Sequence, residues 1–550
     1  MTESTGHLEG LGQFAEQERR LRRSMGFWQL TAISFSGVIG SGWLLAALYA
    51  AQAAGPDAIV TWLVGGVALL LIALVMVELG GSRPESGGLV RWPYYASGRL
   101  VATLVGWGIW IAYATNPPSE SAAMLQYMSK YVSGVYNGTR LTALGVLIAA
   151  GIMAVFVVIN WFGVLLFANV NGALTVAKFV VPTLTVICLF ASGFHGSNYT
   201  AHGGFAPYGF SAGLSAIATA GIIYAYTGFQ GPIDLSGEAR NPRRDVPWSV
   251  ITALVGSMLL YLALQVVFIG VMPGHELIHG WNGISLSSPF AQLAVMLNLS
   301  WLSWVLYADA IASPAGSALT FTATTARESY AMAKNRFLPA AAGKVHERSG
   351  VPRRAMLINY VIGLAFLLPF QSWHSIVAAT SVLGLFAYSI SAVAQSAFRR
   401  REPQRVAGWV RGTKVLAPIS FIIASLILYW ATWQELRIAL PVLLVGVLVY
   451  GYQQVRSGVD RRDIRLGMWL VVYLIVILIM SAIGSFGGAK WIPAPWDSVV
   501  VAVVAVIAFI QGVHDAGQHM EANPPPAPAA PAAAAAAAAT TAALPEPGAA

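Results

Sequence analysis

Two glycine-rich segments interrupt apolar stretches and are the parts of this chain best suited to bind a small charged ligand. The first, residues 36–42, holds three glycines and two serines. Glycine lets a ligand approach the main chain closely, and the start of the half-helix that follows carries about half a positive charge. We therefore predict that a carboxylate binds to the main-chain amides here. The predicted binding residues are Val38, Gly40, Ser41 and Gly42.

The second segment, residues 224–232, adds aromatic rings and an amide to its glycines. Such rings can cover a bound amine or side chain, and the amide can donate or accept hydrogen bonds. Lipid offers no hydrogen bonds, so a helix that opens at membrane depth must line a cavity or a ligand. Two matching breaks indicate the substrate site of a secondary transporter. Close helix packing through small residues is the alternative. The predicted residues are Tyr226, Gly228, Phe229 and Gln230.

Lys178 is the most informative single ionisable residue. It lies in an apolar stretch, residues 164–193, that contains no acidic residue. A lysine at the centre of a membrane costs about 2.5–3.5 kcal/mol, and burial disfavours the charged form of an amine. A site that gains and loses a proton is therefore one reading. The other is a structural lysine that snorkels to the interface or stays charged.

Four acidic residues lie within or beside apolar stretches. Asp309 lies in mid-span, one helical turn before Ser313, which predicts that both face a cavity. Glu120 follows a double proline, where it could form a gate, contact the substrate or pair with a neighbour. Glu78 and Asp234 lie near cytoplasmic ends, and we expect them to be solvated or paired with loops.

The composition is that of a membrane protein. The 550 residues are 57% hydrophobic and 10% charged, with a mean hydropathy of +0.65, whereas soluble domains carry about 25% charged residues. Apolar runs of sufficient length predict fourteen transmembrane helices. Their ranges are 28–54, 57–80, 101–128, 141–161, 164–193, 211–237, 247–272, 287–326, 355–371, 374–398, 415–431, 438–455, 466–486 and 497–514.

The distribution of Lys and Arg predicts the orientation. With the N-terminus in the cytoplasm, 27 of the 32 basic residues fall in cytoplasmic segments and four in external ones, as the positive-inside rule expects. The net charge of +9 is thereby explained without a nucleic-acid partner. We predict a multi-pass inner-membrane protein with a cytoplasmic N-terminal segment (1–27) and a disordered, Pro/Ala-rich cytoplasmic tail (515–550).

Several classes of site are not expected. A single cysteine, Cys188, leaves neither a disulfide framework nor a cysteine cluster for a metal. The sequence contains no phosphate-binding loop that would indicate ATP binding. It also contains no motif that brings together a nucleophile, a histidine and an acid. We therefore expect no cofactor, no metal and no enzymatic activity.

Several motifs in this order resemble those of the amino acid–polyamine–organocation permeases. They are residues 37–42, 226–230, 238–242, 246–247, 309–316, 326–334, 338–339 and 344–352. A smaller set is similar to the branch of bacterial aspartate–proton symporters. That set is Gly80, Pro84, Gly87, Gly88, Arg91, residues 116–120 and Gln230.

The resemblance implies an all-helical core of two inverted five-helix repeats, residues 28–193 and 211–398, with helices 1 and 6 broken. Residues 399–514 would add four further helices. The resemblance also implies that Lys178 is a protonation switch. It would lie near carbonyls of the first break and near hydroxyls such as those of Ser313 or Ser317.

The resulting hypothesis is a permease that carries an acidic or small neutral amino acid together with protons across the lipid bilayer by alternating access. The alternatives are a proton-independent exchanger of amino acids or amines and a membrane receptor that binds without transport. The sequence leaves open the amino acid, the oligomeric state and the roles of helices 11–14 and the tail.

Overall fold

The computed structural model describes residues 25–526, apart from 86, 163, 336, 347–350, 405–409 and 411. Residues 1–24 of the predicted N-terminal segment and 527–550 of the predicted tail lie outside the described residues. The described chain is helical, and its only β-type pairings are isolated bridges, Met25 with Ala239 and Tyr136 with Leu141. An all-helical fold follows, as predicted.

Helices occupy all fourteen of the predicted ranges. They are α2 (Phe27–Val38), α3 (Gly42–Ala54), α4 (Ala58–Ser82), α5 (Gly88–Ala114), α6 (Asn116–Met128), α7 (Ala143–Trp161), α8 (Val164–Gly193), α9 (Phe210–Thr219), α10 (Ile222–Tyr226), α11 (Gly231–Asp234), α12 (Pro242–Gly270), α13 (Pro289–Met296), α14 (Ser300–Lys334), α15 (Arg353–Leu367), α16 (Trp373–Arg401), α17 (Thr413–Trp430), α18 (Thr432–Ser457), α19 (Arg461–Ile483) and α20 (Trp496–Ala522).

Nine stretches of the described chain are long and apolar enough to cross a membrane. One of them, Gly42–Ser82, contains both α3 and α4. The predicted spans outside these nine are divided into short helices, such as α9, α10 and α11, are short themselves, such as α15, or form long helices that are less apolar, such as α5 and α14. The protein is therefore a multi-pass membrane protein.

Both predicted helix breaks are present. α2 ends at Val38 and α3 begins at Gly42, with Ile39 in a non-helical conformation. α10 ends at Tyr226 and α11 begins at Gly231, and between them Gly228 has a φ of +122°, which glycine tolerates best. The chain opens its helices at both predicted glycine-rich segments.

Several helices extend beyond their predicted limits, among them α5, α12, α14 and α20. α5 begins at Gly88 rather than near residue 101, and it is kinked at Gly98, which has a non-helical φ of +86° and lies against Asp463 of α19. There the Asp463 carboxylate accepts hydrogen bonds from the amides of Arg99 (2.8 Å) and Leu100 (3.2 Å), as an N-cap does. α20 continues to Ala522, past the predicted start of the tail at residue 515.

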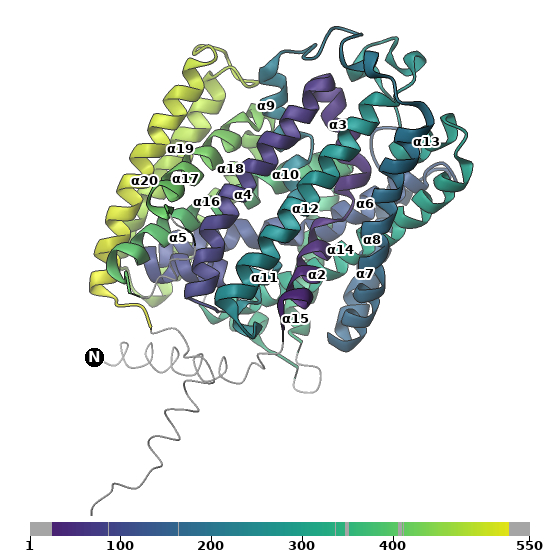
Figure 1. Ribbon diagram of the computed structural model, residues 1–550. Helices are drawn as coiled ribbons and strands as arrows, with labels where there is room; N and C mark the ends of the chain where they lie inside the picture. Colours follow the sequence, from purple (N-terminus) through teal and green to yellow (C-terminus); the bar gives the residue numbers. More distant parts are fainter. Residues whose placement is uncertain are drawn as a thin grey trace, which may run out of the picture.

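The helices that carry the breaks lie inside the bundle. α17–α20 form one side of the molecule and α7, α8 and α13 lie on the opposite side (Figure 1). α16 is buried along its apolar length and packs against α4, α5, α17 and α20. α2 packs against α8, α11, α12 and α14. These neighbours supply the side chains that surround the first break.

Candidate functional site

The two breaks contact each other through their glycines. A Cβ atom added to Gly37 would lie 3.0 Å from the Gly228 Cα, and one added to Gly228 would overlap the Gly37 carbonyl carbon. The Ser34 hydroxyl donates a hydrogen bond to the Phe229 carbonyl over 3.3 Å. Only glycine permits this approach of two main chains, so two segments far apart in the sequence form one site.

Hydroxyl groups from α12 and α14 bind the carbonyls that the first break leaves open. The Tyr261 hydroxyl donates to the Val38 carbonyl (3.0 Å), and the Ser313 hydroxyl donates to the Ile39 carbonyl (3.2 Å). The Ser317 hydroxyl lies 3.4 Å from the Gly37 carbonyl. Buried carbonyls need such partners, so these side chains stabilise the open helix.

Lys178 lies at the same break. Its side chain is 1% exposed, and its Nζ donates hydrogen bonds to the Ser36 carbonyl over 2.6 Å and the Ser36 hydroxyl over 3.4 Å. The predicted position beside first-break carbonyls is thus the one observed. The hydroxyls of Ser313 and Ser317 donate hydrogen bonds to other carbonyls of the first break. The buried amine is thus hydrogen-bonded directly to the main chain of the first break.

Glu120 binds the main-chain amide that we predicted for a substrate carboxylate. Its side chain is 1% exposed, and Oε2 accepts a hydrogen bond from the Ser41 amide over 2.8 Å. Oε1 accepts from the Tyr224 hydroxyl over 2.9 Å. A Cβ on Gly40 would overlap Oε1, so the break is built closely around this carboxylate. The protein's own acid thus occupies part of the expected substrate position.

Three further side chains at this position were not predicted. Asn116 Nδ2 donates to the Tyr224 hydroxyl (2.9 Å), and the Ser119 hydroxyl lies 2.5 Å from that same oxygen. Trp373 Nε1 donates to the Ser41 hydroxyl over 2.7 Å. The four-residue spacing of Asn116 and Glu120 could have placed both on one helix face. No comparable local signal marks Trp373.

Asp309 is a buried acid with open hydrogen-bonding capacity. Among the described residues, neither of its carboxylate oxygens has a hydrogen-bond partner. Its charge and that of Glu120 both act on the Lys178 ammonium. One turn further along α14, Ser313 contacts the first break. One lysine and two acids therefore surround the break in a region that excludes solvent.

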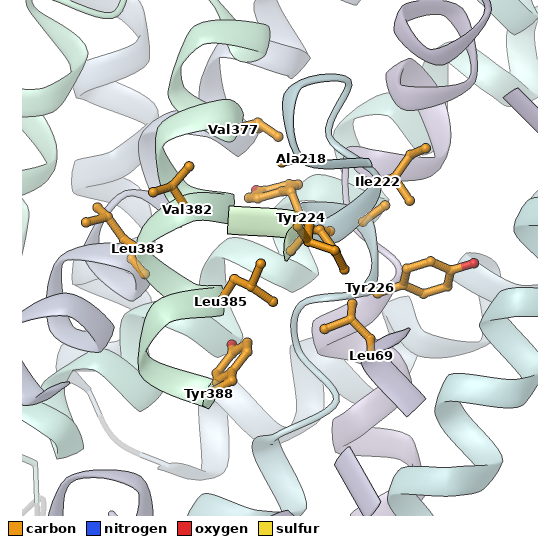
Figure 2. Packing of buried hydrophobic residues seen from close by; sticks show 14 of the residues in the cluster. Leu69, Ala218, Ile222, Tyr224, Tyr226, Val377, Val382, Leu383, Leu385 and Tyr388 are labelled. Atoms are coloured by element: carbon orange, nitrogen blue, oxygen red, sulfur yellow. The ribbon is translucent and has the colours of Figure 1, made fainter. Parts of the chain in front are cut away.

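The second break orients its aromatic rings differently from our expectation. The Tyr226 ring packs edge-on against Trp62 of α4, with centroids 5.5 Å apart, and lies beside Tyr261. Tyr224 instead faces Trp373 of α16, and Figure 2 shows the two tyrosines on opposite sides of α10. We had expected Tyr226 to cover the ligand, but the tyrosine beside Glu120 is Tyr224.

Phe229 and Gln230 contact protein groups in this structure. The Phe229 ring packs edge-on against Tyr388, with centroids 5.5 Å apart. Gln230 Oε1 accepts a hydrogen bond from the Gly228 amide over 2.9 Å, which stabilises the turn of the second break. Both residues thus shape the second break.

The sequence of this chain is similar to those of known transporters along most of its length. A sequence profile described as amino acid permease matches residues 25–450. The glutamate/serine transporter AimA of Bacillus subtilis (strain 168) is 38% identical over 507 residues, which are 89% of this chain and 93% of that protein. The aspartate-proton symporter of the same organism is 33% identical over 497 residues, 88% of this chain and 95% of the relative.

More distant relatives are also transporters. The branched-chain amino acid permease BcaP of Bacillus subtilis is 23% identical over 448 residues, 79% of this chain and 93% of that protein. These relatives are transporters and not enzymes. A profile match over most of the chain, joined to two helix breaks that meet inside a membrane bundle, establishes that this chain belongs to the amino acid permease family.

Proposed function

We propose that the protein is a secondary active transporter of an acidic or small neutral amino acid, driven by the proton gradient across the inner membrane. In this proposal fourteen helices cross the membrane with both termini in the cytoplasm. Residues 28–193 and 211–398 form two inverted repeats that move relative to each other. The observation that carries the proposal is the buried Lys178 ammonium on the Ser36 carbonyl, directly beside the meeting point of the two breaks.

The carboxylate of the amino acid would bind where Glu120 now lies. The Ser41 amide, next to the start of α3, donates to the Glu120 carboxylate over 2.8 Å. A substrate carboxylate has the same charge and geometry, and the helix N-terminus favours it equally. Substrate binding would therefore displace Glu120 toward Tyr224 and Asn116, which already bind its other oxygen.

Proton coupling would act through the first break. A charged Lys178 holds the Ser36 carbonyl and compensates the two nearby acids, Glu120 and Asp309. Loss of the proton weakens that hydrogen bond and removes the compensation, because charge-assisted bonds are about twice as strong as neutral ones. The break could then change shape, which would shift the balance between outward-open and inward-open states.

The relatives support the substrate class. One is named for glutamate and serine and the other for aspartate and protons. Amino acids with acidic or small neutral side chains are the common element of these names. Near the break an acidic substrate would meet one cation, Lys178, and two acids that must be neutralised or moved before it can bind.

A panel of radiolabelled amino acids in proteoliposomes tests the proposal. With an inward proton gradient we expect accumulation of glutamate, aspartate or serine, and collapse of the gradient should reduce it to equilibration. Arginine and lysine should not accumulate. Uptake of a cationic amino acid alone would contradict the substrate class. Counterflow that is equally fast with and without a gradient, with no accumulation, would favour the proton-independent exchanger.

Glu120→Gln is expected to bind the transported amino acid more tightly, by about threefold to tenfold. Glutamine keeps the shape but loses the charge that competes for the Ser41 amide, so a smaller fraction of the protein is blocked. The measurement is the dissociation constant from equilibrium binding to purified protein. Glu276→Gln, in an external loop between α12 and α13, is the matched control and should not change the constant. Weaker binding by Glu120→Gln would indicate that Glu120 contacts the substrate instead of competing with it.

A further inference from the structure

A second pair of buried acids lies at the cytoplasmic end of the bundle, away from the first break. Asp234 ends α11 and is 4% exposed, and Glu328 of α14 is 1% exposed. Their charges act on each other. We had expected Asp234 to be solvated or paired with a loop, and the structure buries it instead. The function proposed above does not use either residue.

The turn between α4 and α5 lies over both acids. Its Gly87, with a φ of +69°, donates its amide hydrogen to the Asp234 carbonyl over 3.2 Å. A Cβ atom added to Gly87 would lie 3.8 Å from both carboxylate oxygens of Glu328. One residue of the turn therefore contacts the main chain of one acid and faces the side chain of the other.

Hydrogen-bonding capacity is left open around the pair. The Tyr113 hydroxyl donates to Asp234 Oδ2 over 3.2 Å. Within the described chain, Asp234 Oδ1, Glu328 Oε2 and the hydroxyl of the buried Tyr388 have no hydrogen-bond partner. Both acids act electrostatically on Tyr113 and Tyr388. Two tyrosines from α5 and α16 thus border the acids and add no positive charge.

The neighbouring cations are paired elsewhere or too distant for an ion pair. Arg327 acts on Asp234 electrostatically, yet within the described residues neither acid has a basic group at ion-pair distance. Arg91 binds Glu85 (3.2 Å) and Arg83 binds Glu402 (2.5 Å). The remaining charged groups on the elements that pack against α11 are Glu78, which pairs with Arg399, Arg99 of α5, Glu238 shortly after α11, and Arg243, Arg244 and Asp245 at the start of α12.

Two ionised carboxylates in this position would be costly. The penalty for burying each uncompensated charge is several kcal/mol, and like charges that share a site raise it further. A single proton held between two acids removes one of the two charges and their mutual repulsion, and the carboxyl that holds it can donate to the other acid or to a nearby oxygen, which stabilises the remaining charge. The open oxygens of Asp234 and Glu328 provide the acceptors for such a proton.

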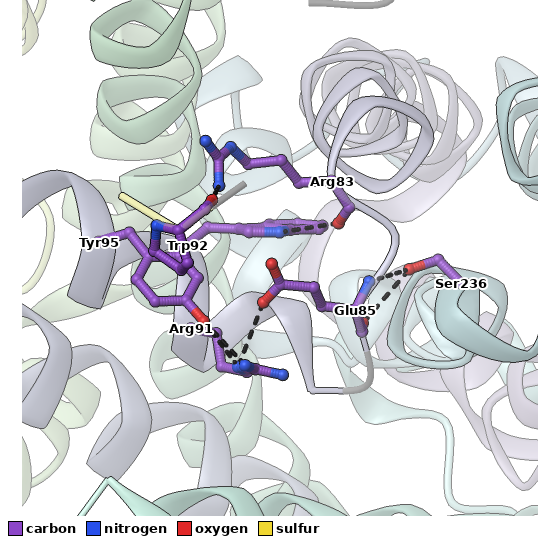
Figure 3. Close-up of polar contacts among 7 residues, drawn as sticks. Arg83, Glu85, Arg91, Trp92, Tyr95 and Ser236 are labelled. Carbon is purple, nitrogen blue, oxygen red and sulfur yellow. Dashed lines mark hydrogen bonds and ion pairs between the residues drawn. The ribbon is translucent and has the colours of Figure 1, made fainter. Parts of the chain in front are cut away.

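We propose that Asp234 and Glu328 form a second proton-binding site, which holds one proton while the turn formed by residues 83–85 and Gly87 is closed and loses it when the turn opens to the cytoplasm. The closed turn is stabilised by the Glu85–Arg91 ion pair and by hydrogen bonds between the Glu85 main chain and the Ser236 hydroxyl (Figure 3). Loss of the proton leaves two negative charges beneath Gly87, and their repulsion weakens the closure. As a cytoplasmic gate, this site rests on the transport function proposed above.

Infrared spectroscopy of the purified full-length protein, without any amino acid, tests the shared proton separately from transport. Near neutral pH the wild type should show a protonated-carboxyl C=O band that shifts in D₂O. Glu328→Gln and Asp234→Asn should each remove that component. Glu276→Gln, which removes an acid from the loop between α12 and α13 and leaves the turn intact, should retain it. An unchanged band in both variants would overturn the proposal. Loss of the wild-type band on addition of sodium at constant pH would also overturn it, because the acids would then bind sodium and not a proton.

Hydrogen exchange of the turn tests the link to opening. After correction for the intrinsic pH dependence, exchange in residues 83–91 of the wild type should rise with pH, by up to about tenfold per pH unit for one linked proton. Glu328→Gln should exchange slowly at every pH. Its melting temperature should equal or exceed that of the wild type, because a neutral amide replaces an uncompensated acid. The proposed gate would be overturned if Glu328→Gln and Asp234→Asn exchanged with the same pH dependence as the wild type. It would also be overturned if both variants were less stable than the wild type.

Discussion

Replacement of Lys178 by Met is expected to abolish proton-driven uptake. In proteoliposomes with an inward gradient of about one pH unit, the accumulation ratio should fall by about tenfold, the factor that one pH unit supplies for one coupled proton. Methionine keeps the length and apolar stem of the side chain but cannot hold a proton or bind the Ser36 carbonyl. Uptake with the gradient should then equal uptake without it.

Lys130→Met is the matched control, because Lys130 is exposed after α6 and outside the helices around the break. It should transport at the wild-type rate. Equilibrium binding of the amino acid to Lys178→Met separates a coupling defect from a loss of fold. Gradient-driven accumulation that survives in Lys178→Met would remove Lys178 from the coupling mechanism.

Gly228→Ala is expected to destabilise the protein severely and to eliminate transport. At a φ of +122° a side chain is strained, at a cost of about 1–3 kcal/mol. The added methyl group would also overlap the main chain of Gly37, and overpacking costs about 1–3 kcal/mol more. The sum is a large part of the roughly 5–15 kcal/mol that stabilises a typical protein.

Thermal denaturation in detergent and uptake in proteoliposomes measure this effect. Gly151→Ala in α7 is the control, since a Cβ there meets no atom within 4 Å, and alanine favours a helix by about 1 kcal/mol. It should be at least as stable as the wild type. Wild-type stability and transport in Gly228→Ala would show that the breaks do not need to contact each other.

The features that could be predicted from sequence have local causes. Glycines at residues 37–42 and 228–231 predict interruptions of long apolar helices, and both interruptions are present. Lys178 stands out because its apolar stretch has no counter-ion, and a carbonyl of the first break provides its partner. The membrane class follows from the composition alone.

The features that sequence did not reveal depend on contacts between distant helices. Nothing near Glu120 indicates that it binds the Ser41 amide, since α6 and the first break meet only in the folded bundle. Tyr226 and Tyr224 are equivalent in sequence, and their neighbours, Trp62 and Trp373, determine which ring borders the site.

For two polar segments the structure differs from the sequence prediction, because hydrophobicity does not reveal which partners a polar residue finds. Asp234 lies near a helix end, where solvent would be expected, but Tyr113 and Gly87 cover it. α20 continues past residue 514 because polar residues there still have partners. Gln511 donates to the Asp515 carboxylate (2.9 Å), and Glu521 pairs with Arg401 of α16.

A density map of the protein saturated with the best amino acid from the uptake panel decides whether the breaks bind substrate. We expect density for one amino acid between residues 38–42 and 226–230, with its carboxylate within about 3 Å of the Ser41 amide and Glu120 turned away. An empty site at saturating ligand, with Glu120 still on that amide and the amino acid bound elsewhere, would contradict this mechanism.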